Sequence, residues 1–360
     1  SWHLLTPGVQ AVFARLATFH GSFDLAAATT IAGAVLDQLA LLTEKSLLQQ
    51  DNDRYEMHPL LSRFAAEKLD ADPSARQAAH GRHAAFYLAF ITGQAPGEEP
   101  AQRRAIQTEL PNIRAAWQWA AAQQQYTLLL DSAATLHNLY SAQSWFREGI
   151  DAFAYALEQL PGNAPETAIQ AQTRCDLLAR KARMHIHIGQ LESARRALDE
   201  ALEHLRFMDN PAPLATILGY MAITAFYAGE LDRAIELAER SLALDEAAGD
   251  LDGIAFALSF LGSCHKSRGE YGRAADCFTR SVAIYAQMGD ELGEAMTLNN
   301  LGNLAQAQGD YTAAHDYYLT CSRLFQAHNH THGAAATLAK GRDFVETLAT
   351  WGLWLILPLG

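Results

Sequence analysis

Histidines are the residues of this sequence that come closest to a chemical pattern. His328, His330 and His332 stand two apart, but no cysteine or acid follows at the spacing that a tetrahedral metal site needs. His185 and His187 are also two apart, in a segment expected to be helical, where residues at that spacing point in different directions. The sequence therefore predicts no metal site.

Nucleophiles and phosphate-binding loops are the next candidates for chemistry. The four cysteines form no CxxC pair, and we expect them to be reduced thiols inside helices: Cys175, Cys264, Cys277 and Cys321. No serine or cysteine stands in a context that identifies a catalytic nucleophile with its base. The pattern Gly-x-x-x-x-Gly-Lys-Ser/Thr is absent. We therefore expect no catalytic residues, no enzyme activity and no cofactor.

A row of amide side chains suits binding better than catalysis. Asn299, Asn303 and Gln306 follow the spacing i, i+4, i+7, which places them on one stripe of a helix. Each amide offers a hydrogen-bond donor and an acceptor, as the backbone of an extended peptide requires. The stripe predicts a peptide-binding surface, with a merely solvated surface as the alternative.

The elements that position this stripe repeat along the chain. Gly189, Gly229, Gly269 and Gly309 stand forty residues apart, and each opens the phrase Gly-x-(Leu/Tyr)-x-x-Ala. The phrase indicates two helices joined by a tight turn in which glycine permits a left-handed backbone. Since one such hairpin cannot bury its apolar face alone, the hairpins should stack into an all-α solenoid with a concave surface.

Small residues mark where neighbouring helices approach in each repeat. Ala222, Gly262 and Gly302 occupy one position of the first helix, in each case four residues after a leucine. The pattern resembles the tetratricopeptide repeat in a long form. A period of forty would also suit a HEAT repeat, but the turn phrase favours the tetratricopeptide repeat.

The resemblance implies a ligand groove along the first helix of each repeat. Ser263 and Lys266 could hold a carboxylate there, while Ile223, Phe226 and Tyr227 would form an apolar floor. The family's concave positions fall here on Arg183, Ile223, Phe226, Tyr227, Ser259, Ser263, Lys266, Asn299, Asn303 and Gln306. A peptide or protein is the partner that this groove implies.

The first 75 residues lack the forty-residue period. Val9–Phe19 and Leu36–Leu48 have helical apolar spacing, and Ser46–Met57 reads as strand, turn and strand before a helix over Leu60–Leu69. Helices followed by a β-hairpin predict a small winged-helix domain. Its six basic residues against nine acidic ones, counted over residues 1–80, argue against DNA binding.

Several phrases together resemble STAND signalling ATPases, the NB-ARC-like class that includes bacterial regulators. Phe13–Ala27, Leu36–Leu48 and Arg54–Leu60 resemble that family's winged helix. Glu109–Trp117 is similar to a helix that these proteins place between winged helix and sensor. The resemblance implies an upstream nucleotide-binding domain as a partner and a sensor role for the repeats.

The same resemblance gives His58 a role. The family's Met-His-Asp motif contacts the nucleotide's β-phosphate through its histidine, and the matching residues here are Met57, His58 and Pro59. His58 would therefore sense nucleotide in the full-length protein, whereas the role of the aspartate is not inherited. The alternative for His58 is a helix-capping or buried histidine.

These observations predict four regions: a winged-helix domain over 1–75, helical bridging hairpins over 76–165, tetratricopeptide repeats over 166–350 and an apolar tail over 351–360. The tail is about half as long as a membrane span, so we expect it to cap the last repeat or to pack on another chain. Without a signal peptide or a membrane span, we expect a cytoplasmic protein. The 40 acidic and 27 basic residues argue against a non-specific nucleic-acid surface.

Two other functions fit the same pattern. The repeats could form a constitutive scaffold for partner proteins, or they could be the sensor part of a transcription regulator.

Overall fold

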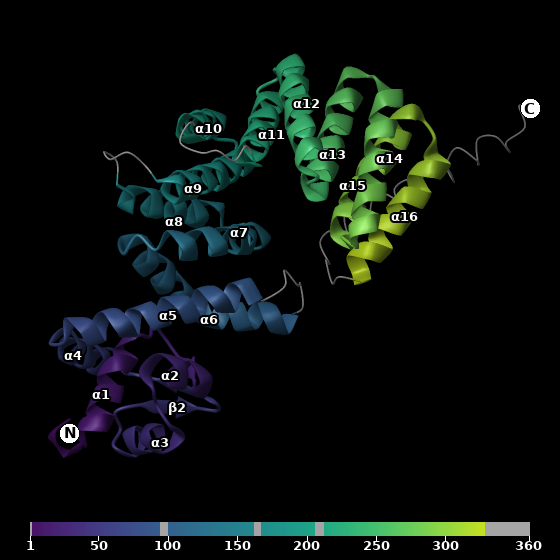
Figure 1. Ribbon diagram of the computed structural model, residues 1–360. Helices are drawn as coiled ribbons and strands as arrows, with labels where there is room; N and C mark the ends of the chain where they lie inside the picture. The colour runs from purple at the N-terminus through teal and green to yellow at the C-terminus, as the bar shows by residue number, and fades with distance from the viewer. Residues whose placement is uncertain (1, 94–99, 162–166, 206–211, 328–360) are drawn as a thin grey trace, which may run out of the picture. The chain divides into compact units, whose positions relative to one another are not determined.

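The computed structural model describes residues 2–93, 100–161, 167–205 and 212–327 (Figure 1). The predictions for His328, His330, His332 and the tail 351–360 lie outside these residues, as does the end of the predicted repeat region. Contacts within the chain define two compact units, Ser1–Met184 and His185–Gly360. The expected all-α class is confirmed, with strands confined to one small sheet in the described part of the first unit.

The first unit begins with short helices around a three-stranded antiparallel sheet. The predicted strand, turn and strand are present, and a short upstream strand that the sequence analysis did not predict joins them to give the order β1-β3-β2. Asn52 has a φ of 52° in the turn between β2 and β3. The elements are η1 (Trp2–Leu4), α1 (Pro7–Arg15), η2 (Leu16–Thr18), β1 (Phe23–Asp24), α2 (Leu25–Ala32), α3 (Leu36–Glu44), β2 (Gln49–Asp51), β3 (Arg54–Glu56) and α4 (Pro59–Asp70).

Longer helices complete the first unit, and they share one apolar core with the sheet. Phe19 stacks on Phe23 with ring centroids 4.1 Å apart, and Trp117 meets Phe153 edge-to-face at 5.7 Å. Trp117 is 2% exposed and belongs to this core. The helices are α5 (Pro73–Gly93), α6 (Pro100–Ala122), α7 (Tyr126–Ala142), α8 (Phe146–Gln159) and α9 (Ala168–His187), of which α9 ends just beyond the division between the units.

The second unit is built from helix hairpins at the predicted period. Turn glycines connect each pair of helices, and Gly189, Gly229, Gly269 and Gly309 have φ values of 73°, 81°, 81° and 78°. The predicted left-handed turns are therefore confirmed. The helices are α10 (Leu191–Leu205), α11 (Ala212–Tyr227), α12 (Leu231–Ala248), α13 (Leu251–Arg268), α14 (Tyr271–Met288), α15 (Glu291–Gln308) and α16 (Tyr311–Ala327).

Close approach within the hairpins depends on the small residues that the sequence placed there. A Cβ atom on Gly262 would lie 2.7 Å from the Phe278 ring, and one on Gly302 would lie 2.5 Å from the Tyr318 ring. Each glycine thus gives room to an aromatic ring on the second helix of its own hairpin. Helix α11 packs against α12, α13 against α14 and α15 against α16 (Figure 1).

Over the residues that the structure describes, no single helix is both long and apolar enough to span a membrane. Helices α2 and α3 reach that length and apolar character only together, and the pair is bent by 104°.

Candidate functional site

Most of the predicted groove residues lie on the first helices of three successive hairpins. Helix α11 carries Ile223, Phe226 and Tyr227, α13 carries Ser259, Ser263 and Lys266, and α15 carries Asn299, Asn303 and Gln306. Helix α11 contacts α13, and α13 contacts α15, so the three helices form one row. Arg183 lies on α9 in the first unit and is therefore not placed relative to this row.

The α11 end of the row is aromatic. Phe226 is half-buried, and its ring is 5.7 Å from those of Tyr227 and Phe260, with both pairs close to perpendicular. Tyr227 is 64% exposed, whereas Ile223 is only 4% exposed. Tyr227 and Phe226 therefore offer the accessible apolar surface, and Ile223 belongs to the core beneath them.

The middle of the row, on α13, is polar. The Ser263 hydroxyl donates to the Ser259 carbonyl at 3.2 Å, and the Ser259 hydroxyl accepts from Thr297 of α15 at 3.5 Å. Lys266 is half-exposed one turn after Ser263. A carboxylate placed here would meet the cationic side chain of Lys266 beside the Ser263 hydroxyl, whose hydrogen bond to the Ser259 carbonyl is long.

The amide stripe on α15 is held from the second helix of its hairpin. The Tyr318 hydroxyl lies 2.9 Å from Asn303 Oδ1 and 3.1 Å from Gln306 Oε1, and these two amide oxygens share its proton. Two of the three amides thus have a structural role as well, which the helical spacing alone did not indicate. The signal that could have revealed it is Gly302, because that glycine brings the Tyr318 ring against α15.

The turns of alternate repeats contain a histidine bond that the sequence analysis missed. His185 Nδ1 lies 2.8 Å from Gln190 Oε1, and His265 Nδ1 lies 2.7 Å from Glu270 Oε2. Hydrogen bonding from His265, together with the charges of Arg268 and Arg273, lowers the pKa of the Glu270 carboxyl. The equivalent positions of the other repeats hold Ala225 and Ala305.

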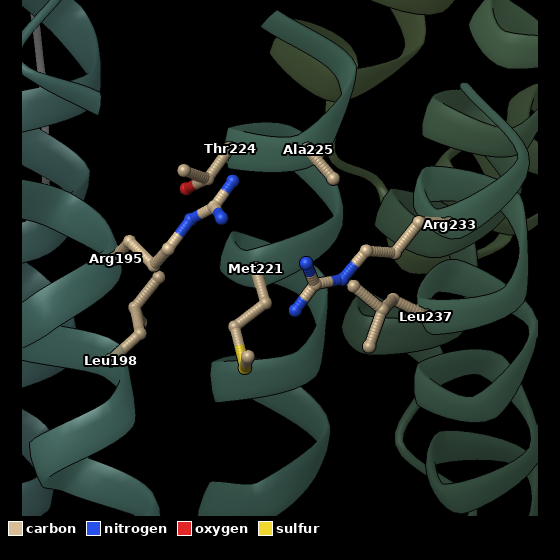
Figure 2. Close-up of a pocket in the computed structure, with 7 residues that line it drawn as sticks. All are labelled: Arg195, Leu198, Met221, Thr224, Ala225, Arg233 and Leu237. Carbon is tan, nitrogen blue, oxygen red and sulfur yellow. The ribbon is translucent and has the colours of Figure 1, made fainter. Parts of the chain in front are cut away.

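Ion pairs link one hairpin to the next beside these turns. Glu230 accepts from Arg195 of the preceding hairpin at 2.8 Å and from Arg233 of its own hairpin at 3.2 Å, and Arg268 pairs with Asp232 of the preceding hairpin. Figure 2 shows Met221 of α11 between the Arg195 and Arg233 side chains, which come from α10 and α12. The cavity there measures only about 10 Å³, roughly the volume needed for a single water molecule. It is a packing gap between repeats rather than a ligand pocket.

A second polar cluster lies in the first unit, far from the repeats in sequence. We call it the buried polar junction: His20, Ser22, Arg54, His83, Glu109 and Asn112. The Asn112 side chain accepts from the His20 backbone N–H at 2.7 Å and donates to the Ser22 carbonyl at 3.2 Å and to Glu109 Oε2 at 3.1 Å. Asn112 is fully buried, at 0% exposure.

Arg54 connects the sheet to the same cluster. Its guanidinium donates to the Ser22 hydroxyl and carbonyl, both at 2.8 Å, and its Nη2 lies 2.6 Å from Glu109 Oε1. Glu109 and Asn112 both belong to the phrase Glu109–Trp117, whose resemblance implied a helix between winged helix and sensor. The structure shows that Glu109 and Asn112 of α6 bind β3 and the loop before β1.

His83 completes the junction from α5. Its Nε2 lies 3.4 Å from Asn112 Oδ1, and the residue is 2% exposed. Burial lowers the pKa of the His83 imidazole to about 3, against a smaller raising effect of the Asn112 hydrogen bond. Burial also raises the pKa of the neighbouring Tyr87 phenol. Both side chains are therefore neutral near pH 7.

His58 occupies the position that the sequence compared with a nucleotide-sensing histidine. Its Nδ1 accepts from the Leu60 backbone N–H at 3.3 Å at the start of α4, and its ring is exposed. The helix-capping alternative therefore describes its contact in this chain, and the exposed ring leaves room for a further partner.

Most of the cysteines are covered by the surrounding helices. Cys175, Cys264 and Cys321 are buried, and Cys277 is half-buried. Burial raises the pKa of the Cys264 thiol to about 12. No group of three or more histidine, cysteine or acidic residues suited to a metal ion occurs in the part of the chain that the structure describes.

Comparison with known families identifies the repeats. The tetratricopeptide repeat model matches residues 213–287 and again 253–327. These ranges take in nearly all of α11 through α16. The prediction of tetratricopeptide repeats, rather than HEAT repeats, is confirmed for this part of the chain.

Curated relatives come from mycobacteria. The chain is 34% identical over 189 residues to proteins of Mycobacterium tuberculosis and Mycobacterium bovis whose proposed role is that of an HTH-type transcriptional regulator. The aligned part covers 48% of this chain and 21% of each relative. The match thus spans about a fifth of the length of these proteins.

Solved structures resemble the chain in fold. A STAND protein with a tetratricopeptide repeat sensor from Pyrococcus horikoshii has a TM-score of 0.50 at 15% identity, covering 99% of this chain and 58% of that one. The apo form of RapI also has a TM-score of 0.50, at 12% identity, covering 81% and 80%. At these identities the likeness concerns the fold alone.

Proposed function

We propose that the repeats are the sensor of a STAND signal-transduction ATPase and bind a peptide or protein on the row α11, α13 and α15. The observation that carries the proposal is the change of side-chain chemistry along this row. Exposed Tyr227 and half-buried Phe226 come first, then Lys266 beside Ser263, then the amides of α15. Such an order matches an extended peptide with an apolar residue at one end and polar groups along the rest.

The residues that we propose to line this groove are those that the sequence indicated, with Ile223 supporting it from below. Arg183, on α9 of the first unit, stays a prediction from the sequence and is not part of this proposed row. Asn299 and the amide groups of Asn303 and Gln306 would bond the peptide backbone, because an amide can pair with both a carbonyl and an N–H.

We further propose that residues 1–75 form a winged-helix domain. The order helix, strand, two helices and two strands, with an antiparallel sheet, supports this assignment. In the full-length protein His58 would contact the nucleotide of an upstream domain, and its exposed ring is compatible with that contact. Residues 76–165 would connect this domain to the repeats, and the protein would act in the cytoplasm of a bacterium.

The switch in this proposal is a shift between two conformations. Ligand in the groove would favour the state in which the ATPase domain exchanges nucleotide, and a useful shift requires a preference of several kcal/mol. A phosphate-binding loop encoded upstream of Ser1 would support this mechanism. A complete gene without one would instead leave the repeats as a scaffold.

A selection experiment tests the groove. A phage-displayed peptide library is panned on the purified chain, and the selected peptides are measured by calorimetry. We expect Tyr227→Ala with Asn299→Ala to weaken their binding by roughly tenfold to a hundredfold, the usual effect of removing central contacts. Glu239→Ala, on the exposed face of α12, is the matched control. Peptides that bind all three proteins equally would place the binding surface elsewhere.

A role as part of a transcription regulator is the second candidate. The proposed role of the mycobacterial relatives favours it, although the chain matches only 21% of their length. The α3 helix argues against direct DNA contact by residues 1–75, because it carries Asp37 and Glu44 and no basic residue. We therefore expect no gel shift of random duplex DNA by this chain, and a shift at physiological salt would favour the second candidate.

A further inference from the structure

The buried polar junction joins segments that are distant in sequence. Asn112 of α6 bonds Ser22 and His20, which stand 90 and 92 positions away. Arg54 of β3 reaches both Ser22 and Glu109. One cluster therefore fastens the sheet and the loop before it to α6, with His83 of α5 alongside.

Each contact in the junction depends on the others. Glu109 uses one carboxylate oxygen for Arg54 and the other for Asn112, while Asn112 uses both its oxygen and its nitrogen. If the sheet moved only slightly away from α6, the carboxylate and the amide would lose partners where water is excluded. Such a half-open arrangement is costly, because buried polar groups without partners are destabilising.

Stability alone does not explain why charged groups lie here. Desolvation of a buried ion pair roughly offsets the attraction within it, so apolar residues would hold these segments equally well. Apolar contacts are already present, since Phe19 stacks on Phe23 and meets Tyr87 edge-to-face at 6.3 Å. The polar groups instead fix the relative position of the sheet and α6, because their hydrogen bonds form only in one such position.

The junction is also accessible from one side. The Arg54 side chain is 29% exposed, whereas that of Glu109 is 10% exposed. Water, or an anion competing for the guanidinium, therefore reaches Arg54 more readily than Glu109. Once Arg54 is withdrawn, the Glu109 carboxylate loses its counter-charge and must be hydrated.

We propose that the buried polar junction gives the first unit two conformations, closed and open, between which the sheet and α6 separate in one cooperative step. In the closed conformation all the bonds of the junction are made, and in the open one water replaces them. This inference concerns contacts within the first unit and does not depend on what the repeats bind.

Hydrogen exchange of the full chain, followed by mass spectrometry, tests the proposal. We expect peptides covering 20–24, 49–57 and 105–113 to exchange through one shared opening. Glu109→Gln should accelerate exchange in all three by about tenfold or more, because it removes a charge-assisted bond between buried groups. Peptides of α7 (Tyr126–Ala142), which lies outside the junction, should keep their rates.

The matched control is the exposed ion pair of α4. Arg63 and Glu67 have side chains that are 83% and 65% exposed, so Arg63→Ala should change none of the three peptides. If Glu109→Gln accelerates only 105–113, the contacts are independent and the proposal is wrong. Should Glu109→Gln fail to fold, Arg54→Lys is measured in the same way, since it keeps the charge but loses the paired bonds to Ser22.

Discussion

Burial of a single imidazole makes the first unit sensitive to acid. The pKa of His83 in the folded chain, about 3, lies below its ordinary value of 6.5. Between these values the unfolded chain binds a proton that the folded chain does not, so stability falls as the pH drops from about 6.5 to about 3. Above that window this group contributes no dependence on pH.

We therefore expect His83→Gln to flatten the pH dependence of the unfolding free energy. The slope removed should approach about 1.4 kcal/mol per pH unit at most. Denaturant unfolding at pH 7, 6, 5 and 4 measures it. Burial also lowers the pKa values of His20 and His80, so some slope should remain. An unchanged slope would contradict the burial of a neutral His83 imidazole.

The hydrogen bond from the Tyr318 hydroxyl to the amides of Asn303 and Gln306 allows an effect on stability to be measured apart from an effect on peptide binding. Tyr318→Phe removes the hydroxyl that serves Asn303 and Gln306. We expect a loss of about 0.5–1.5 kcal/mol in unfolding free energy, measured by denaturant titration. Asn303→Ala should lose a similar amount, and peptide binding as well. If Tyr318→Phe has no effect on stability, the hydroxyl is hydrated rather than bonded.

At the scale of the hairpin, glycine decides how closely two helices pack. Gly262→Ala places a methyl group within 2.7 Å of the Phe278 ring, so the ring or a helix must shift. We expect a loss of about 1–3 kcal/mol, as for other overpacked sites. Thermal and denaturant unfolding measure it.

Gly272→Ala is the control for that substitution. It lies in the same hairpin, at the start of α14, and a Cβ atom there would meet nothing within 4 Å. This variant should be neutral or slightly more stable, because alanine favours a helix over glycine. Equal effects of the two substitutions would show that close packing is not the cause.

Periodicity explains which elements were predictable from the sequence. The turn glycines, the small residues Gly262 and Gly302, and the β2–β3 hairpin each have a local pattern of turn or helix spacing. Strand β1 has two residues, Phe23 and Asp24, which is too short for any period. A pattern can identify such elements only where several residues share it.

Contacts between distant residues were not predictable for a different reason. Arg54 and Glu109 belong to separate elements, and helical spacing states which face a residue occupies but not what lies opposite. The burial of Ile223 illustrates this, since its position on α11 suggested the groove while the packing of the hairpin covers it. Domain limits and ligand contacts therefore remain predictions.

At the scale of the whole molecule, several contacts of the helix hairpins repeat with the forty-residue period. Ser241 and Ser281 each donate to a backbone carbonyl 26 residues earlier at 2.8 Å, and Asp250 and Asp290 cap α13 and α15 through Gly253 and Gly293. These contacts within and at the start of a hairpin recur forty residues apart, and Gly253 and Gly293 lie in the same way against Asp245 and Tyr285 of the preceding hairpin.

Removal of one hairpin should therefore leave a folded chain. We expect deletion of 250–289 to keep the helical fraction in circular dichroism and a cooperative thermal transition, at a lower midpoint. Deletion of 250–269 removes α13 alone and should aggregate, because the apolar face of α14 then lacks its partner. Equal behaviour of the two deletions would show that the period is not the unit of folding.

The repeated caps and serine bonds also bear on inheritance. A duplication or loss of one period in the gene inserts or removes a hairpin whose two ends already match what they meet. The changed chain can therefore fold with the interfaces that it already has. Descendants of this chain can thus differ in the length of the sensing row before they differ in its chemistry, and array length is the trait on which selection can act first.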